Sequence, residues 1–277
     1  MPCRPEVDAM TTMPTIPEPQ DDDLSPLLSE PFARAWIAPT PAARGPVGER
    51  LSGRLQRSLD AERGMVTVRQ RSSRFEPLDC GVQRRWLYRA PAERALRPGE
   101  PRSAAVLELE AGASIRLGAG GLREFLVMQG RVAIDGEPLG PRDFLLLPPG
   151  STPQLVSSEG AQVFVREAEG PAAERTLVRD AEAGWPEFAP GIRRRVLWSG
   201  AGQASLLYRA DPGASVPVHS HGHDEECLMV QGELFLDDLL LQQGDYQLAP
   251  AGTGHRITET DTGVILYAHG DLDLRFT

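Results

Sequence analysis

The sequence contains two copies of one series of short segments, and this duplication restricts the possible folds more than any other feature. The matched pairs are 81–88 with 191–198, 112–115 with 213–216, 126–130 with 228–232, and 143–150 with 245–252. The offset between partners stays between 101 and 110 residues, so each copy spans about 95 residues. Solenoid repeats are only about 20 to 50 residues long, and two copies of this length instead predict a duplicated β barrel or sandwich.

Both copies consist of short β-type runs. After Met65, these runs alternate with glycine and proline, and no helical periodicity of useful length returns. Ahead of them, residues 1–23 are rich in proline and aspartate, and we expect them to be disordered. Residues 46–63 predict one amphipathic helix, because an apolar residue recurs at every fourth position. The sequence thus predicts an all-β protein with an N-terminal arm, partly disordered and partly helical, over 1–65 and domains over 66–170 and 171–277.

The net charge of −10 lies entirely in the last 67 residues, which also hold all five histidines. Residues 211–277 contain twelve acidic residues and two arginines. This balance argues against nucleic-acid binding and favours a site for cations. Three scattered cysteines exclude a disulfide framework, and no window has the apolar length of a transmembrane helix or signal peptide. We therefore expect a soluble cytoplasmic protein without membrane contact.

The second copy carries a set of side chains that can bind a metal. His219 and His221 are two residues apart, so on a strand both imidazoles point to the same face. A short turn can return Glu225 on the neighbouring strand, and a second turn precedes His255. Three imidazoles and one carboxylate suit zinc, iron(II), manganese, nickel or copper. The alternative is a set of histidines without metal, but this spacing between glycines that match in the two copies favours a metal site.

The first copy lacks these ligands. The matching positions hold Gly118, Gly120, either Arg123 or Glu124, and Pro153. Glycine and proline offer no side-chain donor, so we expect no metal in this copy. Its barrel is expected to be structural, with binding of a small anion or apolar ligand through Arg116 or Arg123 as the alternative.

Several residues near the predicted ligands have more than one interpretation. Strand alternation from Glu225 points Cys227 and Met229 into the barrel and Glu226 outward. His223 lies in the turn before Glu225, where it is either solvated, a fifth ligand or a proton shuttle. His269 is expected at an exposed strand edge.

Residues 213–232 and 244–259 resemble the two signature motifs of the cupin superfamily, with Glu259 where the second motif ends in asparagine. The resemblance implies two tandem jelly-roll barrels of the RmlC-like type, a layout called a bicupin. It also implies one divalent transition metal, zinc or iron with manganese or nickel as further candidates. The implied ligands are His219, His221, Glu225 and His255.

The segment 185–197, followed by 212–215, resembles the ChrR-like cupins, and a weaker version begins at Phe75. ChrR-type proteins are anti-sigma factors whose N-terminal domain binds zinc through histidine and Cys-x-x-Cys. This chain has no histidine before His219 and no such cysteine pair. The resemblance therefore implies a regulatory or sensor protein of the stress-response type that has lost the zinc anti-sigma motif. A small-molecule ligand, a sigma factor and a second copy of the chain in a homodimer are the partners expected.

The same four ligands also occur in cupin dioxygenases that use iron(II). The alternative function is thus an iron(II)-dependent dioxygenase acting on a small ketone or related oxygenated substrate, and a storage or scaffold bicupin is a third reading. The ligand types do not separate zinc from iron.

Overall fold

The computed structural model describes residues 48–49, 51–53, 56, 64–170, 173–273 and 275–276. The chain divides into two compact units, 1–55 and 56–277. Residues 48–49, 51–53 and 56 are helical, whereas the rest of the helix expected over Pro46 to Arg63 lies outside the described residues, as does the disorder expected over 1–23. Among the described helices, none has the length and apolar character needed to cross a membrane.

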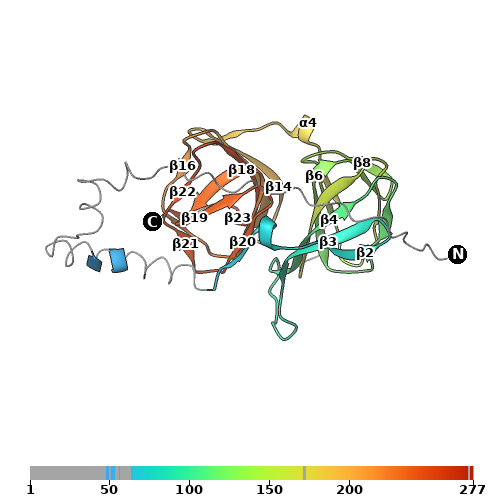
Figure 1. The fold of residues 1–277 in the computed structure, drawn as a ribbon, viewed down its shortest axis with the longest axis horizontal. Coiled ribbons are helices and arrows are strands. Elements are labelled where there is room, and N and C mark those ends of the chain that lie inside the picture. The colour runs from blue at the N-terminus through green and yellow to red at the C-terminus, as the bar shows by residue number, and fades with distance from the viewer. Residues whose placement is uncertain are drawn as a thin grey trace, which may run out of the picture. The chain divides into compact units, whose positions relative to one another are not determined.

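The second unit contains two barrels built of antiparallel strands, each from two sheets (Figure 1). The first barrel contains β2 (Glu76–Asp79), β3 (Val82–Arg89), β4 (Pro101–Leu109), β5 (Ser114–Arg116), β6 (Leu122–Gly130), β7 (Val132–Ile134), β8 (Glu137–Leu139), β9 (Phe144–Leu147), β10 (Gln154–Val156) and β11 (Ala161–Ala168). The second contains β13 (Glu187–Ala189), β14 (Ile192–Gly200), β15 (Gln203–Ala210), β16 (Ser215–Val216), β17 (His219–Ser220), β18 (Glu225–Leu236), β19 (Leu239–Gln242), β20 (Tyr246–Ala249), β21 (Gly254–His255), β22 (Thr258–Glu259), β23 (Val264–Asp271) and β24 (Arg275–Phe276). The predicted all-β class and the two tandem barrels are confirmed.

The two barrels exchange a strand. β1 (Val66–Val68) precedes the first barrel but pairs with β20 of the second, and β12 (Thr176–Val178) precedes the second barrel but pairs with β9 of the first. A short helix follows each exchanged strand, η2 (Gln70–Ser72) and α4 (Asp180–Ala183). The sheet of each barrel thus includes a strand from the segment predicted as the other domain.

An aspartate anchors each exchanged strand. Asp245 accepts a hydrogen bond from the Gln70 amide (2.8 Å) and pairs with Arg69 (2.9 Å). In the first barrel, Asp143 accepts a hydrogen bond from the Asp180 amide (2.8 Å) and pairs with Arg179 (3.0 Å). The exchange therefore follows the internal repeat.

Removing the first exchanged strand is expected to destabilise the protein. A chain beginning at Ser73 leaves the β20 edge and the buried Asp245 without their partners, and such losses cost about 2 to 3 kcal/mol. We expect its thermal midpoint to fall by about 5 °C or more relative to a chain beginning at Gly64. Equal midpoints in differential scanning calorimetry would show that the exchange contributes nothing to stability.

The described residues form three apolar cores. One core fills the interior of each barrel, and a third lies between the barrels. On β6, Phe125 faces its own barrel's interior while Leu126 faces the core between the barrels. On β18, Cys227 likewise faces the interior of the second barrel while Leu228 faces the core between the barrels. Because both faces of these strands are buried, each carries a continuous apolar run, over 125–128 in β6 and 227–230 in β18.

Candidate metal centre

The two histidines of the His-x-His sequence lie together in the second barrel. His219 is the first residue of β17 and His221 is the residue after that strand ends, and both side chains are buried. Their ring centroids are 5.3 Å apart. The extended backbone therefore places both imidazoles on one side, as alternation predicts.

β21 brings the third imidazole opposite the first. In the pairing of β17 with β21, His255 lies directly across from His219. Gly254 allows this close approach, because a Cβ atom there would lie 2.3 Å from the carbonyl oxygen of His219. The His255 ring centroid is 5.0 Å from that of His221 and 5.7 Å from that of His219.

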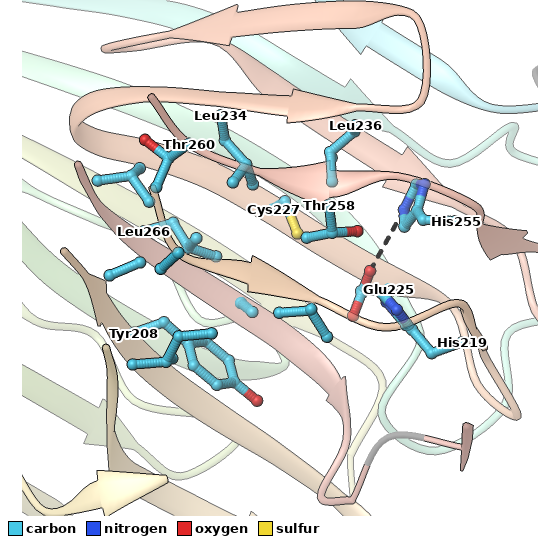
Figure 2. A pocket seen from close by; sticks show the side chains of 16 residues that line it. Tyr208, His219, Glu225, Cys227, Leu234, Leu236, His255, Thr258, Thr260 and Leu266 are labelled. Atoms are coloured by element: carbon cyan, nitrogen blue, oxygen red, sulfur yellow. Dashed lines mark ion pairs between the residues drawn. The ribbon is translucent and has the colours of Figure 1, made fainter. Parts of the chain in front are cut away.

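Glu225 completes the group from the first position of β18 (Figure 2). Its Oε2 atom is 3.1 Å from Nε2 of His221 and 3.6 Å from Nε2 of His255. Among the described residues, donor atoms of His219, His221 and Glu225 lie within 4.8 Å of one another. The structure thus gathers all four predicted ligand residues at one place.

Two of the imidazoles are held so that Nε2 is left to bind a metal. His219 Nδ1 lies 3.0 Å from the carbonyl oxygen of Pro217, which can only accept, so Nδ1 carries the proton. His255 Nδ1 lies 3.3 Å from Asp237, and the Asp237 carboxylate accepts a further bond from the Arg256 amide (2.8 Å). Such outer contacts fix the tautomer and ring orientation of metal-binding histidines.

The donor set fits a divalent transition metal. Nε2 of His221 and Nε2 of His255 are buried and face the Glu225 carboxylate, but neither makes a well-aligned hydrogen bond to the described residues, an arrangement that costs free energy unless an ion uses the lone pairs. Burial alone would raise the pKa of Glu225, but His221 and His255 outweigh burial and lower the pKa to about 2. Burial also lowers the pKa of His221. At neutral pH the carboxylate is ionised and His221 is neutral, the forms that bind metals. Burial alone would lower the pKa of His255, but Asp237 and Glu225 outweigh burial and raise it to about 9, so an ion that binds here must displace a proton from His255.

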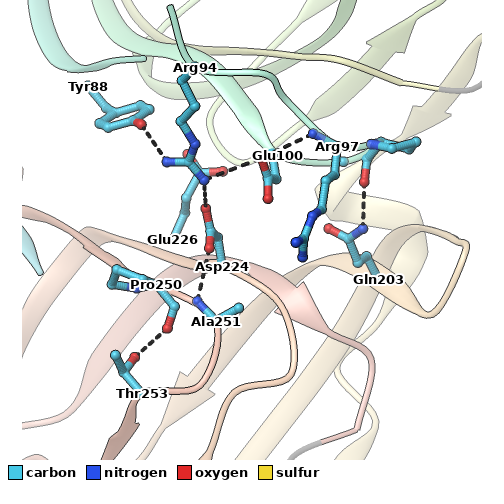
Figure 3. A network of polar contacts seen from close by, with 12 residues as sticks. Tyr88, Arg94, Arg97, Glu100, Gln203, Asp224, Glu226, Pro250, Ala251 and Thr253 are labelled. Carbon is cyan, nitrogen blue, oxygen red and sulfur yellow. Dashed lines mark hydrogen bonds and ion pairs between the residues drawn. The ribbon is translucent and has the colours of Figure 1, made fainter. Parts of the chain in front are cut away.

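Asp224, which the sequence did not single out, joins the two turns that carry the ligands (Figure 3). One oxygen accepts a hydrogen bond from the Ala251 amide (2.9 Å), in the turn that precedes His255. The other accepts one from Arg94 (2.9 Å), which belongs to the first barrel and also contacts Tyr88 (3.1 Å). The first barrel therefore supports the ligand-bearing turns of the second. The only signal in the sequence was the position of Asp224 next to Glu225.

Replacing Arg94 with alanine is expected to weaken metal binding by up to about tenfold, since outer residues that orient ligands have effects of this size. The affinity can be measured by competition with a chromophoric chelator. Arg97→Ala is the matched control, because Arg97 lies in the same loop and its contact to Glu100 (3.1 Å) is made by its backbone amide, which the substitution leaves in place (Figure 3). Equal losses of metal affinity in Arg94→Ala and Arg97→Ala would rule out a specific role for Arg94 in supporting the ligand-bearing turns.

The first barrel holds an ion pair where the second gathers its ligands. Strand register equates Arg123 with Glu225, since Arg123 faces Leu147 on β9 and Glu225 faces Ala249 on β20. Arg123 pairs with Glu167 (2.9 Å) and donates to the carbonyl oxygen of Gly118 (2.6 Å). Its guanidinium fills the space beside Gly120, where a Cβ atom would lie 2.3 Å from Nη2. Because the Arg123 guanidinium already donates to Glu167 and to the Gly118 carbonyl, binding of an anion through Arg123 is disfavoured.

Five other predicted positions can be placed. Cys227 and Met229 face the interior core of the second barrel, as expected, and Glu226 points outward to the buried contact with the first barrel. His223 pairs with Asp271 (2.6 Å) outside the ligand group. The exposed position expected for His269 is wrong: its side chain is 1% exposed, because the first barrel covers that face of β23 and Glu124 lies 3.4 Å from its Nδ1.

A cavity of about 60 Å³ opens beside the ligands inside the second barrel (Figure 2). Its wall includes His219, Glu225 and His255, and aliphatic side chains make up most of the remainder. Burial raises the pKa of the lining Tyr208 hydroxyl to about 12, so this group is uncharged at neutral pH. The arrangement can place a small molecule directly beside a bound metal.

Comparison with known proteins agrees with this architecture. Residues 173–273 match the model of the ChrR cupin-like domain family. A search of curated protein sequences gave no significant match.

Solved structures share the fold across both barrels. A Nostoc punctiforme protein provisionally named a dioxygenase has a TM-score of 0.60 at 13% identity, over 75% of this chain and 83% of its own. A deletion mutant of Bacillus subtilis oxalate decarboxylase has a TM-score of 0.55 at 16% identity, over 74% of this chain and 76% of its own. That decarboxylase has Mn(II) centres. Residues 173–273, in the second barrel, therefore match the ChrR cupin-like domain family, and the chain has the fold of two-barrel cupin proteins.

Proposed function

We propose that the protein is a metal-dependent sensor whose second barrel holds one divalent transition metal through His219, His221, Glu225 and His255. The observation that carries the proposal is the complete ligand set within the ChrR cupin-like domain, beside a cavity of its own. The metal supplies a Lewis-acidic position for an oxygen atom of a small ligand. Zinc is the ion that a sensing role favours.

The surrounding residues give this site a route to the rest of the molecule. Pro217 and Asp237 orient two of the imidazoles, and Glu225 provides the anionic ligand. Asp224 connects the ligand-bearing turns to Arg94 of the first barrel. A ligand that shifts these turns would therefore alter the contact between the barrels, and such a differential contact is what a sensor requires.

The response to the ligand is proposed to pass through the barrels or the helix expected over 46–63. A zinc-bound sigma-binding fold needs cysteine or histidine ligands, and residues 1–65 offer one cysteine and no histidine. The test is a pull-down of extracytoplasmic-function sigma factors with the full chain and with residues 1–65. Chelator-sensitive capture by residues 1–65 alone would contradict this route.

An iron(II)-dependent dioxygenase is the second candidate. It is favoured by the cavity that adjoins the four ligand residues, because an octahedral metal with four protein ligands keeps two positions for substrate and oxygen. In that case Glu225 and the three imidazoles hold the ion while the cavity positions a small ketone or related oxygenated substrate.

Metal analysis of protein purified without oxygen tests the proposal and separates the two candidates. We expect about one equivalent of zinc per chain for the sensor, with no oxygen uptake when ketones are added. Stoichiometric iron together with ketone-dependent oxygen uptake would replace the sensor by the dioxygenase. Absence of any transition metal would exclude both.

A further inference from the structure

The cavity beside the metal centre has a composition that restricts what it can bind. Apart from the ligand residues, the described side chains in its wall carry no charge. Leu234, Leu236 and Leu266 form much of the aliphatic surface, from β18 and β23 (Figure 2). A second charged group on a ligand would be buried here without a partner, and an unpaired buried charge costs several kcal/mol.

One polar group in the wall is left free. The hydroxyl oxygen of Thr258 is buried and has no hydrogen-bond partner among the residues that the structure describes. The neighbouring lining threonine, Thr260, is by contrast fully engaged, since it donates to the Glu233 carbonyl (2.7 Å) and accepts from the Gly263 amide (2.9 Å). Figure 2 shows Thr258 between Cys227 and the ligand residues. Its hydroxyl is therefore available to a molecule bound next to the metal.

The size of the cavity limits the ligand. A single water needs about 10 to 15 Å³ of such space, so about 60 Å³ accommodates about four to six atoms of similar size.

We propose that this site selects a small molecule with one oxygen-bearing head group, set at the metal centre and hydrogen-bonded by Thr258, and a short uncharged hydrocarbon tail that fills the cavity. The inference rests on the proposed metal site, because the head group needs the metal. It excludes small dicarboxylates, whose second carboxylate would find no cationic partner among the described side chains of the wall.

Calorimetric titration of the zinc-loaded full chain with acetate, propanoate, butanoate and malonate tests the selection. Each added methylene is expected to raise the affinity by about fourfold until the cavity is full. Malonate is similar in size to butanoate, and we expect it to bind at least about tenfold more weakly. Equal affinities along the monocarboxylate series, or tighter binding of malonate, would overturn the inference.

Two substitutions separate a binding role from a structural one. Thr258→Val is nearly isosteric and is expected to lower the affinity for butanoate by about fivefold to tenfold, the usual effect of losing one hydrogen bond. Its thermal midpoint should stay unchanged or rise, since an unpartnered buried hydroxyl is removed. Ala214→Leu narrows the cavity and should abolish the gain in affinity with tail length. Ala210→Val is a milder substitution in the same wall, and Val196→Leu, at an exposed position, is the control. Unchanged butanoate affinity in both Thr258→Val and the narrowed cavity would also contradict the inference.

Metal content is measured on every sample, which keeps the two hypotheses apart. A chain with one equivalent of zinc that does not discriminate tails contradicts the cavity inference alone. A chain that binds no metal removes the proposed function, and the inference falls with it.

Discussion

Replacing His219 and His221 together with alanine is expected to reduce bound metal from about one equivalent per chain to below about a tenth, because a site with half its protein ligands loses most of a binding free energy of about 10 kcal/mol or more. The variant should remain folded. The three apolar cores and the strand ladders of both barrels do not depend on these two side chains. Elemental analysis after purification without chelator gives the metal content, and far-ultraviolet circular dichroism reports the fold.

His223→Ala is the matched control for this experiment. It removes a histidine from the same turn, but one that pairs with Asp271 outside the ligand group. We expect full metal content in this variant. Two equivalents per chain in the unmodified protein would show that the first barrel also binds metal, despite the Arg123–Glu167 pair in the corresponding place.

The sequence was sufficient to predict the barrels and the grouping of the four candidate ligand side chains, because both depend on local patterns. The repeat fixed the number of barrels, and strand alternation aligned His219 with His221 and distinguished the inner face at Cys227 from the outer face at Glu226. The register of the first barrel needed the structure. A one-residue shift decides whether Arg123 or Glu124 corresponds to Glu225, and only the pairing of β6 with β9 resolves it.

Long-range contacts were the part that the sequence did not reveal. Residues 66–68 have the same apolar pattern whichever barrel they join, so the strand exchange has no local signature. His269 was expected to be exposed because alternation identifies the outer face of a strand but not what covers that face. Here the other barrel covers it, and the outward-facing polar residues form a buried network.

Arg166 lies at the centre of that network between the barrels. It pairs with Glu124 of its own barrel (3.0 Å) and with Glu226 of the second barrel, and all three side chains are at most 1% exposed. Tyr267 donates to Glu124 (2.7 Å) and Tyr246 donates to Glu226 (2.7 Å). The two carboxylates therefore share one cation, and hydroxyl groups and, at Glu124, the His269 ring make further contacts with them.

Replacing Arg166 with methionine is expected to lower the free energy of unfolding by about 3 to 5 kcal/mol, because it leaves two buried carboxylates without their cation. Urea denaturation followed by circular dichroism gives this value. Combining Arg166→Met with Glu124→Gln and Glu226→Gln removes the charges as well, and should recover much of the loss. Arg102→Met is the control: its pair with Glu169 is about half exposed, and such pairs contribute less than about 1 kcal/mol.

Acid unfolding provides a second measurement of the same network. Burial alone would raise the pKa of Glu124, but Arg166 and His269 outweigh it and lower the pKa from 4.5 to about 2. A lowered carboxyl pKa stabilises the folded state above pH 4.5, and this stability is lost as the pH falls from 4.5 toward 2. The unmodified chain should therefore lose stability steeply over this range, whereas Arg166→Met should show a shallower slope. Parallel slopes, or a loss below about 1 kcal/mol in urea, would mean that the apolar core between the barrels holds them together without help from these charges.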